Sequence, residues 1–483
     1  KEYMERRAKI VATIGPASQD EATLEKLFKA GMNVARLNFS HGTHEDHAKR
    51  IENIRRTSSA MGLPVGILLD LQGPKLRVGV LPKPLQLSFD ELVRVYCQDD
   101  AAPEGEEQKI PVTFPELFES VHAGDRLLLD DGRLVLVVVS VKGRVILARV
   151  VVGGTLTSNK GINLPGVRLR IPGFTEKDES DLSFGLKQGV DAIAISFVRS
   201  VQDVIHVRHA IKRLLPMSQP LPLVIAKLER PEALDDLENI LDAVDGVMVA
   251  RGDLGVEMPP ERVPIMQKRI IHAANAKAKL VITATQMLES MITNPLPTRA
   301  EASDVANAIF DGTDAIMLSG ETAAGKYPVE AVAMMDRIAR EAESHFLEWG
   351  QPRQRETDGL GETDAAAMAR AAYAIARDRD VAGISVFTRH GSTAWLMSKV
   401  RAQVPVIAFT SDENTYRQMS FLWGISPRRI EFVETLRAMI ERVDDQLLET
   451  NNFRPGDQVV IICGFPVGAL RNPNMALLHT IGE

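Results

Sequence analysis

Charged side chains stand at the ends of two short apolar segments. Lys227 and Glu229 close LVIAKLE (223–229), and Asp253 follows GVMVAR (246–251). Residues two positions apart in a strand share a face, so the Lys227 ammonium is expected to point to the same side as Glu229. Carboxylates without thiolates or abundant histidine suit Mg²⁺ or Mn²⁺ better than zinc. A divalent cation and a lysine together would hold a phosphoryl group during its transfer.

Simpler interpretations of these residues stay open. Each acid could pair with a neighbouring base, Arg230 or Arg251. Lys227 could form only a salt bridge, or it could form a Schiff base, as in aldolase-type barrels. An adjacent carboxylate would keep the ammonium protonated, which disfavours the Schiff base.

Further polar residues follow other apolar segments. Arg36 and Asn38 share one face near the end of NVARLNF (33–39), where an arginine can bind phosphate through two parallel hydrogen bonds or pack on the next helix. Gly252 would let backbone N–H groups approach an anion. Thr285 could relay a proton through water, or it could cap the next helix. Thr298 and Glu301 form a capping box, which we interpret as structural.

Eight apolar segments, most of them about one βα unit apart, would position these residues. Continuous apolar runs suit strands buried on both faces of a parallel sheet, and eight of them predict a (β/α)₈ TIM barrel with its active site at the carboxyl ends of the strands. The segments are KIVATI (9–14), NVARLNF (33–39), VGILLD (65–70), DAIAIS (191–196), LVIAKL (223–228), GVMVAR (246–251), LVITAT (280–285) and DAIMLS (314–319).

Two other domains are predicted around this barrel. Residues 73–173 alternate in short strands with turns at Asp131-Gly132 and Lys142-Gly143, which predicts a small inserted β-barrel domain. The barrel itself would comprise 1–72 and 174–345. Residues 346–483 predict a doubly wound α/β domain that begins after a polar, charged linker at 351–361.

Composition limits the possible partners. The chain has 483 residues and a net charge of −7. An acidic chain argues against nucleic acid or an anionic membrane as the main partner, and no apolar run is long enough to span a bilayer. The two cysteines, Cys97 and Cys463, are far apart in sequence, so we expect a reduced, cytoplasmic protein.

Several strings closely resemble the pyruvate kinase family. The resemblance covers almost the whole chain; it is strong in the barrel and weak in the insert and the C-terminal domain. The strings are NVARLNFSHG (33–42), LLDLQGPKLR (68–77), NKGINLPG (159–166), AKLE (226–229), MVARGDLGVE (248–257) and a longer run at 282–328. The resemblance implies a glycolytic transferase that moves the phosphoryl group of phosphoenolpyruvate to ADP, giving pyruvate and ATP. It also implies a homotetramer.

The resemblance implies roles for individual residues. Glu229 and Asp253 would bind Mg²⁺, and Lys227 would stabilise the phosphoryl group in transit. Arg36 would contact the phosphate, while Gly252, Asp253 and Thr285 would bind the substrate, with Thr285 in the proton relay. The nucleotide would be bound by Asn38, Arg77 and Lys160, the last from an inserted domain that acts as a lid.

One departure concerns the monovalent cation. Many members hold K⁺ at positions matching Asn38, Ser40, Asp70 and Leu71, with a glutamate at position 75. Here position 71 is leucine and position 75 is lysine. An ammonium about 4 Å from an anion is worth about 4 kcal/mol at an effective dielectric of about 20, so Lys75 is expected to replace the ion and make K⁺ unnecessary.

The C-terminal domain resembles the effector domain of the family. Thr388, Arg389, Gly391, Ser392 and Thr393 join a strand to a helix, and their amides and hydroxyls would hold a phosphate. Histidine stands at position 390, where a serine is frequent, and we favour a sugar monophosphate or AMP as the allosteric effector. An ordinary capped turn is the alternative.

Two other functions are weighed against the kinase. A metal-dependent aldolase or lyase acting on a pyruvate enolate would also place acidic ligands at strand ends, but it needs neither a nucleotide-facing lid nor the phosphate-binding set. A non-catalytic sensor of phosphorylated metabolites would use only the C-terminal domain. The complete set of residues at the barrel rim argues against the sensor.

Overall fold

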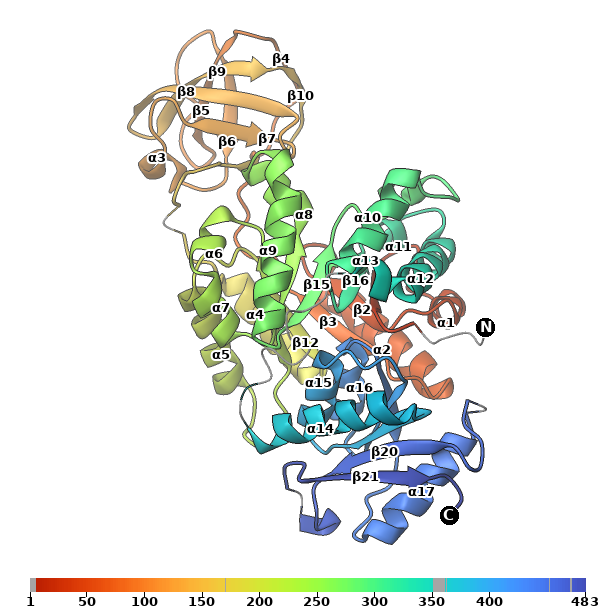
Figure 1. Cartoon of the computed structure of the whole chain (residues 1–483). Helices are drawn as coiled ribbons and strands as arrows, with labels where there is room; N and C mark the ends of the chain where they lie inside the picture. Colours follow the sequence, from red (N-terminus) through yellow and green to blue (C-terminus); the bar gives the residue numbers. More distant parts are fainter. Residues whose placement is uncertain (1–5, 170, 351–360, 362, 451, 470) are drawn as a thin grey trace.

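The structure is a computed structural model that describes residues 6–169, 171–350, 361, 363–450, 452–469 and 471–483. Most of the predicted linker, 351–360, lies outside the described residues. The chain forms a central barrel with the inserted β domain at one end and the C-terminal α/β domain at the other (Figure 1). Each domain has its own buried apolar core.

Eight parallel strands close the barrel in the order β1-β16-β15-β14-β13-β12-β3-β2. Every one lies within a segment that the sequence predicted as a strand. Their residues are almost all buried, because side chains point both into the barrel and toward the surrounding helices. The strands are β1 (Lys9–Thr13), β2 (Val34–Asn38), β3 (Gly66–Asp70), β12 (Ala192–Ile195), β13 (Leu223–Leu228), β14 (Gly246–Ala250), β15 (Leu280–Ala284) and β16 (Ala315–Leu318).

Helices surround these strands, and several begin at capping boxes. The predicted capping box at the start of α10 is confirmed, since the backbone N–H of Glu301 donates to Thr298 and the Glu301 carboxylate accepts from Thr298. The helices are α1 (Glu21–Lys29), α2 (His44–Ala60), α4 (Glu176–Lys187), α5 (Val201–Leu214), α6 (Pro231–Asp235), α7 (Leu237–Ala243), α8 (Arg251–Glu257), α9 (Val263–Ala276), α10 (Arg299–Phe310), α11 (Gly320–Ala323), α12 (Pro328–Ser344) and α13 (Phe346–Trp349), with 3₁₀ turns η1 (Pro260–Arg262) and η2 (Glu289–Ile292).

The inserted domain contains two sheets around one core. The six-stranded sheet has the order β11-β7-β8-β9-β5-β6, and β10 pairs with β4. Both predicted turns are present, and Gly132 and Gly143 adopt positive φ there. The elements are β4 (Leu85–Leu87), β5 (Leu92–Cys97), β6 (Gln108–Val112), α3 (Leu117–Ser120), β7 (Arg126–Leu129), β8 (Leu134–Lys142), β9 (Val145–Val152), β10 (Gly154–Leu156) and β11 (Ile162–Asn163).

The C-terminal domain is a five-stranded sheet in the order β19-β18-β17-β20-β21. All its pairings are parallel except that of β20 with β21. The sequence predicted β17, β18 and β20 but missed the two edge strands. The elements are α14 (Asp364–Arg379), β17 (Gly383–Phe387), α15 (Ser392–Lys399), β18 (Val406–Thr410), α16 (Glu413–Gln418), η3 (Met419–Phe421), β19 (Ile425–Arg429), α17 (Leu436–Leu448), β20 (Gln458–Cys463), η4 (Val467–Ala469) and β21 (Met475–Thr480).

Buried aspartates attach this domain to the amino-terminal end of the barrel. Asp314 precedes β16, and its carboxylate forms ion pairs with Nζ of Lys399 at 2.6 Å and with the guanidinium of Arg401 at 2.7 Å. Asp191 precedes β12, and its carboxylate forms an ion pair with the guanidinium of Arg417 at 2.8 Å. The C-terminal domain is therefore held at the end of the barrel opposite the carboxyl ends of its strands.

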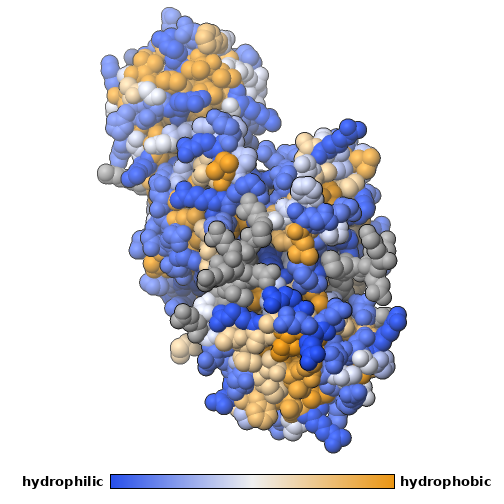
Figure 2. Space-filling view, viewed as in Figure 1, coloured by the Kyte–Doolittle hydropathy of each residue, from blue (hydrophilic) through white to orange (hydrophobic). Residues whose placement is uncertain are grey.

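Figure 2 shows a mostly hydrophilic surface on the face in view, with apolar residues gathered over parts of the inserted and C-terminal domains. Among the described residues, no helix combines the length and apolar character needed to cross a membrane.

Candidate active site

The ammonium of Lys227 lies among polar groups at the carboxyl ends of the barrel strands. Lys227 is near the end of β13, and its Nζ is 2.7 Å from Oε1 of Glu229 and 3.4 Å from Oδ1 of Asp70. It also donates to Oγ of Ser196 at 2.9 Å. Burial opposes the positive charge, but the two carboxylates outweigh it and hold the pKa of Lys227 above its ordinary value. Lys227 therefore stays a cation, and the side chain faces Glu229 as the i, i+2 spacing predicted.

Arg36 supplies a second buried cation beside Lys227. It lies near the end of β2, and its guanidinium donates to Oδ2 of Asp70 at 2.7 Å and to Oγ1 of Thr13 at 2.8 Å. Burial favours the protonated acid, but Lys227 and Arg36 hold the pKa of Asp70 below its ordinary value. The alternative that Arg36 packs on the following helix is wrong, because the guanidinium points into the mouth and contacts β3 and β1.

Glu229 and Asp253 bring two acidic groups to this rim. Glu229 is buried and accepts the backbone N–H of Phe197 at 3.0 Å as well as the Lys227 ammonium. The two neighbouring bases are used elsewhere, since Arg230 pairs with Glu257 and Arg251 pairs with Asp304. The alternative that Arg230 or Arg251 neutralises these acids is therefore wrong, and Lys227 is the base that pairs with Glu229.

Asp253 lies in the first turn of α8 and keeps solvent-exposed surface. Crowding by protein atoms and the nearby charge of Glu229 raise the pKa of its carboxyl to about 7. Two mutually repelling carboxylates beside a single ammonium are an arrangement that a divalent cation would stabilise.

Thr285 connects β15 to the start of α8. Its Oγ1 accepts the backbone N–H of Gly252 at 2.7 Å and donates to the carbonyl of Ala284 at 2.7 Å. Thr285 has a φ of 66°, a left-handed conformation that is costly for a β-branched residue. The side chain caps no following helix, so that alternative for Thr285 is wrong.

The inserted domain reaches toward the same rim. Its β7–β8 turn carries Asp131, whose negative charge contributes to the raised pKa of Asp253. Lys160 belongs to the same domain and pairs with Asp130 of that turn at 2.8 Å. Arg77 forms a β-bridge with Gly161, the residue after Lys160. Arg77 and Lys160 thus lie on neighbouring segments at the hinge.

Comparison with known proteins places the chain in a family. The family model described as pyruvate kinase, barrel domain, matches residues 5–332, and the model described as pyruvate kinase, alpha/beta domain, matches residues 366–479. The chain belongs to the pyruvate kinase family.

Curated pyruvate kinases are similar over nearly the full length. The chain is 44% identical to pyruvate kinase of Geobacillus stearothermophilus over 99% of this chain and 81% of that protein. It is also 44% identical to pyruvate kinase of Mycobacterium tuberculosis, with 99% of each chain covered. A crystal structure of a pyruvate kinase from Cryptosporidium parvum matches with a TM-score of 0.89 and 34% identity, over 99% of this chain and 96% of that one.

Pyruvate kinases need a divalent metal, and the residues at the barrel mouth fit one. Among the described residues, no group of three or more histidine, cysteine, aspartate or glutamate side chains could hold an ion. Glu229 and Asp253 would therefore supply only two ligands and leave the other positions to substrate or water. Such partial coordination is typical of Mg²⁺ at phosphoryl-transfer sites.

Lys75 does not form the contact with Asp70 that was expected if its ammonium takes the place of K⁺. Asn38, Ser40, Asp70 and Leu71 do lie together at the ends of β2 and β3, where Oδ1 of Asn38 accepts the Ser40 N–H at 3.1 Å. Lys75 is exposed and makes no ion pair with Asp70, because Asp70 is buried between Arg36 and Lys227. Surrounding protein atoms remove part of the hydration of its ammonium, and this desolvation, with the nearby charges of Arg77 and Lys177, lowers the pKa of Lys75.

Three residues at the mouth were missed by the sequence interpretation. Thr13 ends β1 and Ser196 directly follows β12, so both stand at strand ends where the same rule would have found them. Ser196 joins Lys227 to the carbonyl of Leu71, to which its hydroxyl donates at 2.6 Å. Phe197 acts through its backbone N–H, and a sequence carries no signal for that.

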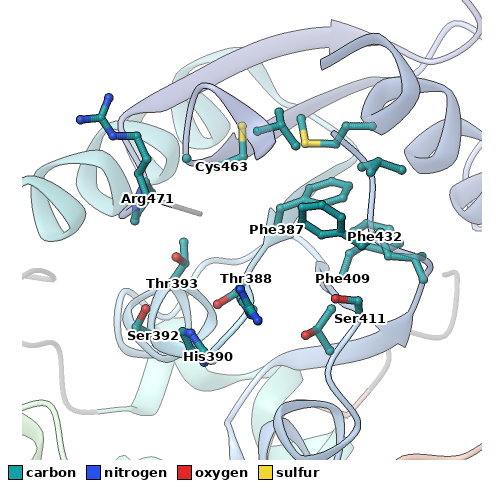
Figure 3. A pocket seen from close by; sticks show the side chains of 18 of the residues that line it. Phe387, Thr388, His390, Ser392, Thr393, Phe409, Ser411, Phe432, Cys463 and Arg471 are labelled. Atoms are coloured by element: carbon teal, nitrogen blue, oxygen red, sulfur yellow. The ribbon is translucent and has the colours of Figure 1, made fainter. Parts of the chain in front are cut away.

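A pocket in the C-terminal domain contains most of the predicted effector residues (Figure 3). Thr388, Arg389, Ser392 and Thr393 line it, whereas Gly391 does not but precedes α15 with a φ of 80°. No side chain caps the start of α15 in the described structure, which disfavours the alternative of an ordinary capped turn. Figure 3 shows Thr388, His390, Ser392 and Thr393 on one side of the pocket and the aromatic residues Phe387, Phe409 and Phe432, with Ser411 beside them, on another.

Proposed function

We propose that this member of the pyruvate kinase family transfers the phosphoryl group of phosphoenolpyruvate to ADP through the barrel-mouth residues described above. The single observation that carries this assignment is the position of the Lys227 ammonium, 2.7 Å from Glu229 and close enough to Asp253 to influence its pKa. The ammonium, together with a divalent cation held by the two carboxylates on the same rim, would bind and neutralise a migrating phosphate.

The chain's own residues would act through alignment and charge. Arg36 would contact the phosphate, and Lys227 would offset the negative charge that spreads over its oxygens. The backbone N–H of Gly252 and the hydroxyl of Thr285 would hold the substrate carboxylate, exchanging their present 2.7 Å hydrogen bond for bonds to the ligand. Thr285 would then belong to the water-linked relay that delivers a proton to the enolate carbon.

Glu229 and Asp253 would hold the metal ion, Mg²⁺ or Mn²⁺. When bound, the ion supplies positive charge that lowers the energy of the transferring phosphoryl group. The arrangement favours a hard divalent cation because the two protein ligands are carboxylates.

The inserted domain would act as a lid over the nucleotide. Asn38 from the barrel, Arg77 from the hinge and Lys160 from the domain would face ADP or ATP. Lys160 would leave Asp130 for a nucleotide phosphate when the lid closes, and closure would exclude water from the transfer.

A coupled assay tests the function directly. Purified protein with phosphoenolpyruvate, ADP and Mg²⁺ is expected to form pyruvate and ATP. The aldolase alternative predicts turnover without ADP, or borohydride trapping of pyruvate on Lys227. Lys227 is held protonated by its two carboxylate neighbours, which makes it a poor Schiff-base nucleophile.

K⁺ is proposed to be dispensable, although not because Lys75 fills the ion position. Leu71 offers no side-chain oxygen to an ion, and Lys75 and Arg77 repel an incoming cation near the hinge. Turnover is expected to be similar in K⁺ and Na⁺ salts. Activity that is negligible in Na⁺ and restored by K⁺ would refute the proposal.

The C-terminal pocket is proposed to bind a phosphorylated allosteric effector, a sugar monophosphate or AMP. The backbone amides at the start of α15 and the hydroxyls of Ser392 and Thr393 would hold the phosphate. Ser392→Asp would repel it, so the variant is expected to lose any response of the phosphoenolpyruvate saturation curve. Curves unchanged by candidate phosphates in the wild-type chain would remove this part of the proposal.

The remaining features are proposed from the family. A homotetramer is expected to sediment at about four times the 53.1 kDa chain mass. A cytoplasmic, glycolytic role follows from the same resemblance and is tested by the location of the tagged protein in its cell of origin.

A further inference from the structure

Both segments that join the inserted domain to the barrel contact residues that hold the metal ligands. The first segment contains Gly73, whose φ is 69°. A Cβ at this glycine would lie 3.1 Å from Cβ of Ser196 and 3.3 Å from the ring of Phe197. The hinge therefore packs directly on the end of β12, and only a glycine fits there without displacing its neighbours.

Phe197 transmits this contact to Glu229. Its backbone N–H donates to Oε2 of Glu229 at 3.0 Å, and the residue adopts a left-handed φ of 58°. The ring packs against the core of the inserted domain and lies 6.0 Å from the guanidinium of Arg230. Phe197 thus contacts the inserted domain with its side chain and a metal ligand with its backbone.

The second segment, which contains Asn163 and Val167, contacts a buried ion pair of the barrel. Arg230 directly follows Glu229, and its guanidinium is 3.0 Å from Oε1 of Glu257, at the last residue of α8. Both side chains are at most 3% exposed. Because Asp253 lies in the first turn of α8, the pair joins the two segments that carry the acidic ligands.

The inserted domain supplies donors and acceptors to this pair. Nδ2 of Asn163 donates to Oε1 of Glu257 at 3.0 Å, and Arg230 donates to the carbonyl of Val167 at 3.3 Å. Oε2 of Glu257 is buried and has no hydrogen-bond partner among the described residues. The carboxylate therefore depends on Asn163 and Arg230, and losing one of them leaves a buried charge poorly solvated.

We propose that Asn163 is a positioning residue through which docking of the inserted domain on the Arg230–Glu257 pair sets the separation of Glu229 and Asp253. This inference rests on the proposed function, in which those two acids bind the metal. Glu257 is four residues beyond Asp253 in α8, or about 6 Å along the helix axis. A displacement of Glu257 would therefore also move Asp253, which lies one turn away in the same helix.

Asn163→Asp tests the proposal with little change in size. It replaces the amide donor by a carboxylate that repels Glu257. We expect the dissociation constant for Mn²⁺, measured by electron paramagnetic resonance without substrate, to rise roughly tenfold, the low end for losing a hydrogen bond to a buried charge. Hydrogen exchange of the backbone at 251–257 is expected to accelerate.

Thr155→Val is the matched control. The Thr155 hydroxyl donates to the side chain of Gln86 at 2.7 Å, inside the same domain and away from the barrel. This variant should bind Mn²⁺ as the wild-type protein does. A rise equal to that of Asn163→Asp would attribute the effect to general loosening of the domain and overturn the proposal.

The double variant Asn163→Asp, Glu257→Gln separates positioning from damage to the fold. The amide introduced by Glu257→Gln can donate to the carboxylate introduced by Asn163→Asp, so the contact is restored in the opposite sense, and Mn²⁺ affinity should recover most of the loss. Unchanged affinity in the single variant, or no recovery in the double variant, contradicts the proposal. If the wild-type protein instead makes no ATP from phosphoenolpyruvate and ADP, the proposed function fails, whatever these affinities are.

Discussion

Acidification is expected to weaken metal binding in the ligand-free protein, because a proton competes with the metal for Asp253. The pKa of that carboxyl is raised to about 7 by crowding and by Glu229. The carboxyl is therefore mostly protonated at pH 6 and mostly ionised at pH 8. Because a metal binds only the ionised form, the dissociation constant for Mn²⁺ should rise about tenfold from pH 8 to pH 6. An ordinary aspartate would change almost nothing over this range.

Electron paramagnetic resonance of free Mn²⁺ gives the affinity at each pH without substrate or turnover. The titration belongs to the Glu229 and Asp253 pair and not to one residue, so only its midpoint is assigned. Asp131→Asn provides a matched perturbation, since it removes a nearby negative charge and an asparagine tolerates the left-handed backbone at that position, where φ is 55°.

The Asp131→Asn variant should shift the midpoint to lower pH, because the ionised form of Asp253 loses a repulsive neighbour. Asp253→Asn should bind Mn²⁺ weakly and show no midpoint near pH 7. A midpoint near pH 4 in the wild-type protein would refute this account of the site. A midpoint that persists near pH 7 in Asp253→Asn would show that a different group titrates.

Three further variants probe other parts of the chain. Lys227→Met should lower turnover by roughly 10²–10³-fold or more while the circular dichroism spectrum stays unchanged, and near-normal turnover would exclude Lys227 from the chemistry. Lys75→Glu should make turnover respond to K⁺ over Na⁺, because a carboxylate replaces a repelling cation; equal rates in both salts would contradict this. Asp314→Asn removes the carboxylate that faces the buried Lys399 and Arg401. Urea unfolding should show that the free energy of unfolding falls by about 3–5 kcal/mol. A fall of less than about 1 kcal/mol would show that these ion pairs contribute little to stability.

The barrel could be predicted from the sequence because burial on both faces of a parallel sheet leaves a continuous apolar run. DAIAIS (191–196) and DAIMLS (314–319) each show this pattern, and each contains a barrel strand. Side chains at strand ends could be predicted for the same reason, since parallel strands bring their carboxyl ends to one rim. The contact between Lys227 and Glu229 could be predicted from their spacing of two residues alone.

The edge strands of the C-terminal sheet could not be predicted in this way. β19 (Ile425–Arg429) has the sequence ISPRR. Because it contains a proline and two arginines, it is not a continuous apolar run and does not match the pattern used to predict the other strands. The proline is tolerated because β19 lies at the edge of the sheet, where an unpaired N–H is not required on both sides. β21 (Met475–Thr480) pairs antiparallel at the other edge, so neither face needs to be fully apolar.

Lys75 shows a different limit. Its charge and its position in a family motif were visible, but its side-chain direction depends on the hinge that follows β3. Asp70 is already occupied by Arg36 and Lys227, residues 34 and 157 positions away in sequence. Which of several cations pairs with a buried carboxylate depends on how the whole barrel packs. The residues around Lys75 in the sequence therefore could not predict that Asp70 pairs with Arg36 and Lys227.

Backbone strain at the mouth has a consistent location. Phe197 follows β12 and Thr285 follows β15, and both have left-handed φ values that cost a non-glycine residue on the order of 1–3 kcal/mol. Each uses that conformation to hold the neighbouring strand's functional group: Phe197 donates to Glu229 and Thr285 accepts from Gly252. Since β12 pairs with β13 and β14 pairs with β15, these two residues lie on either side of β13 and β14, the strands that lead to Glu229 and Asp253. Their hydrogen bonds therefore tie the segments that carry Glu229 and Gly252 to the adjacent strand ends on both sides.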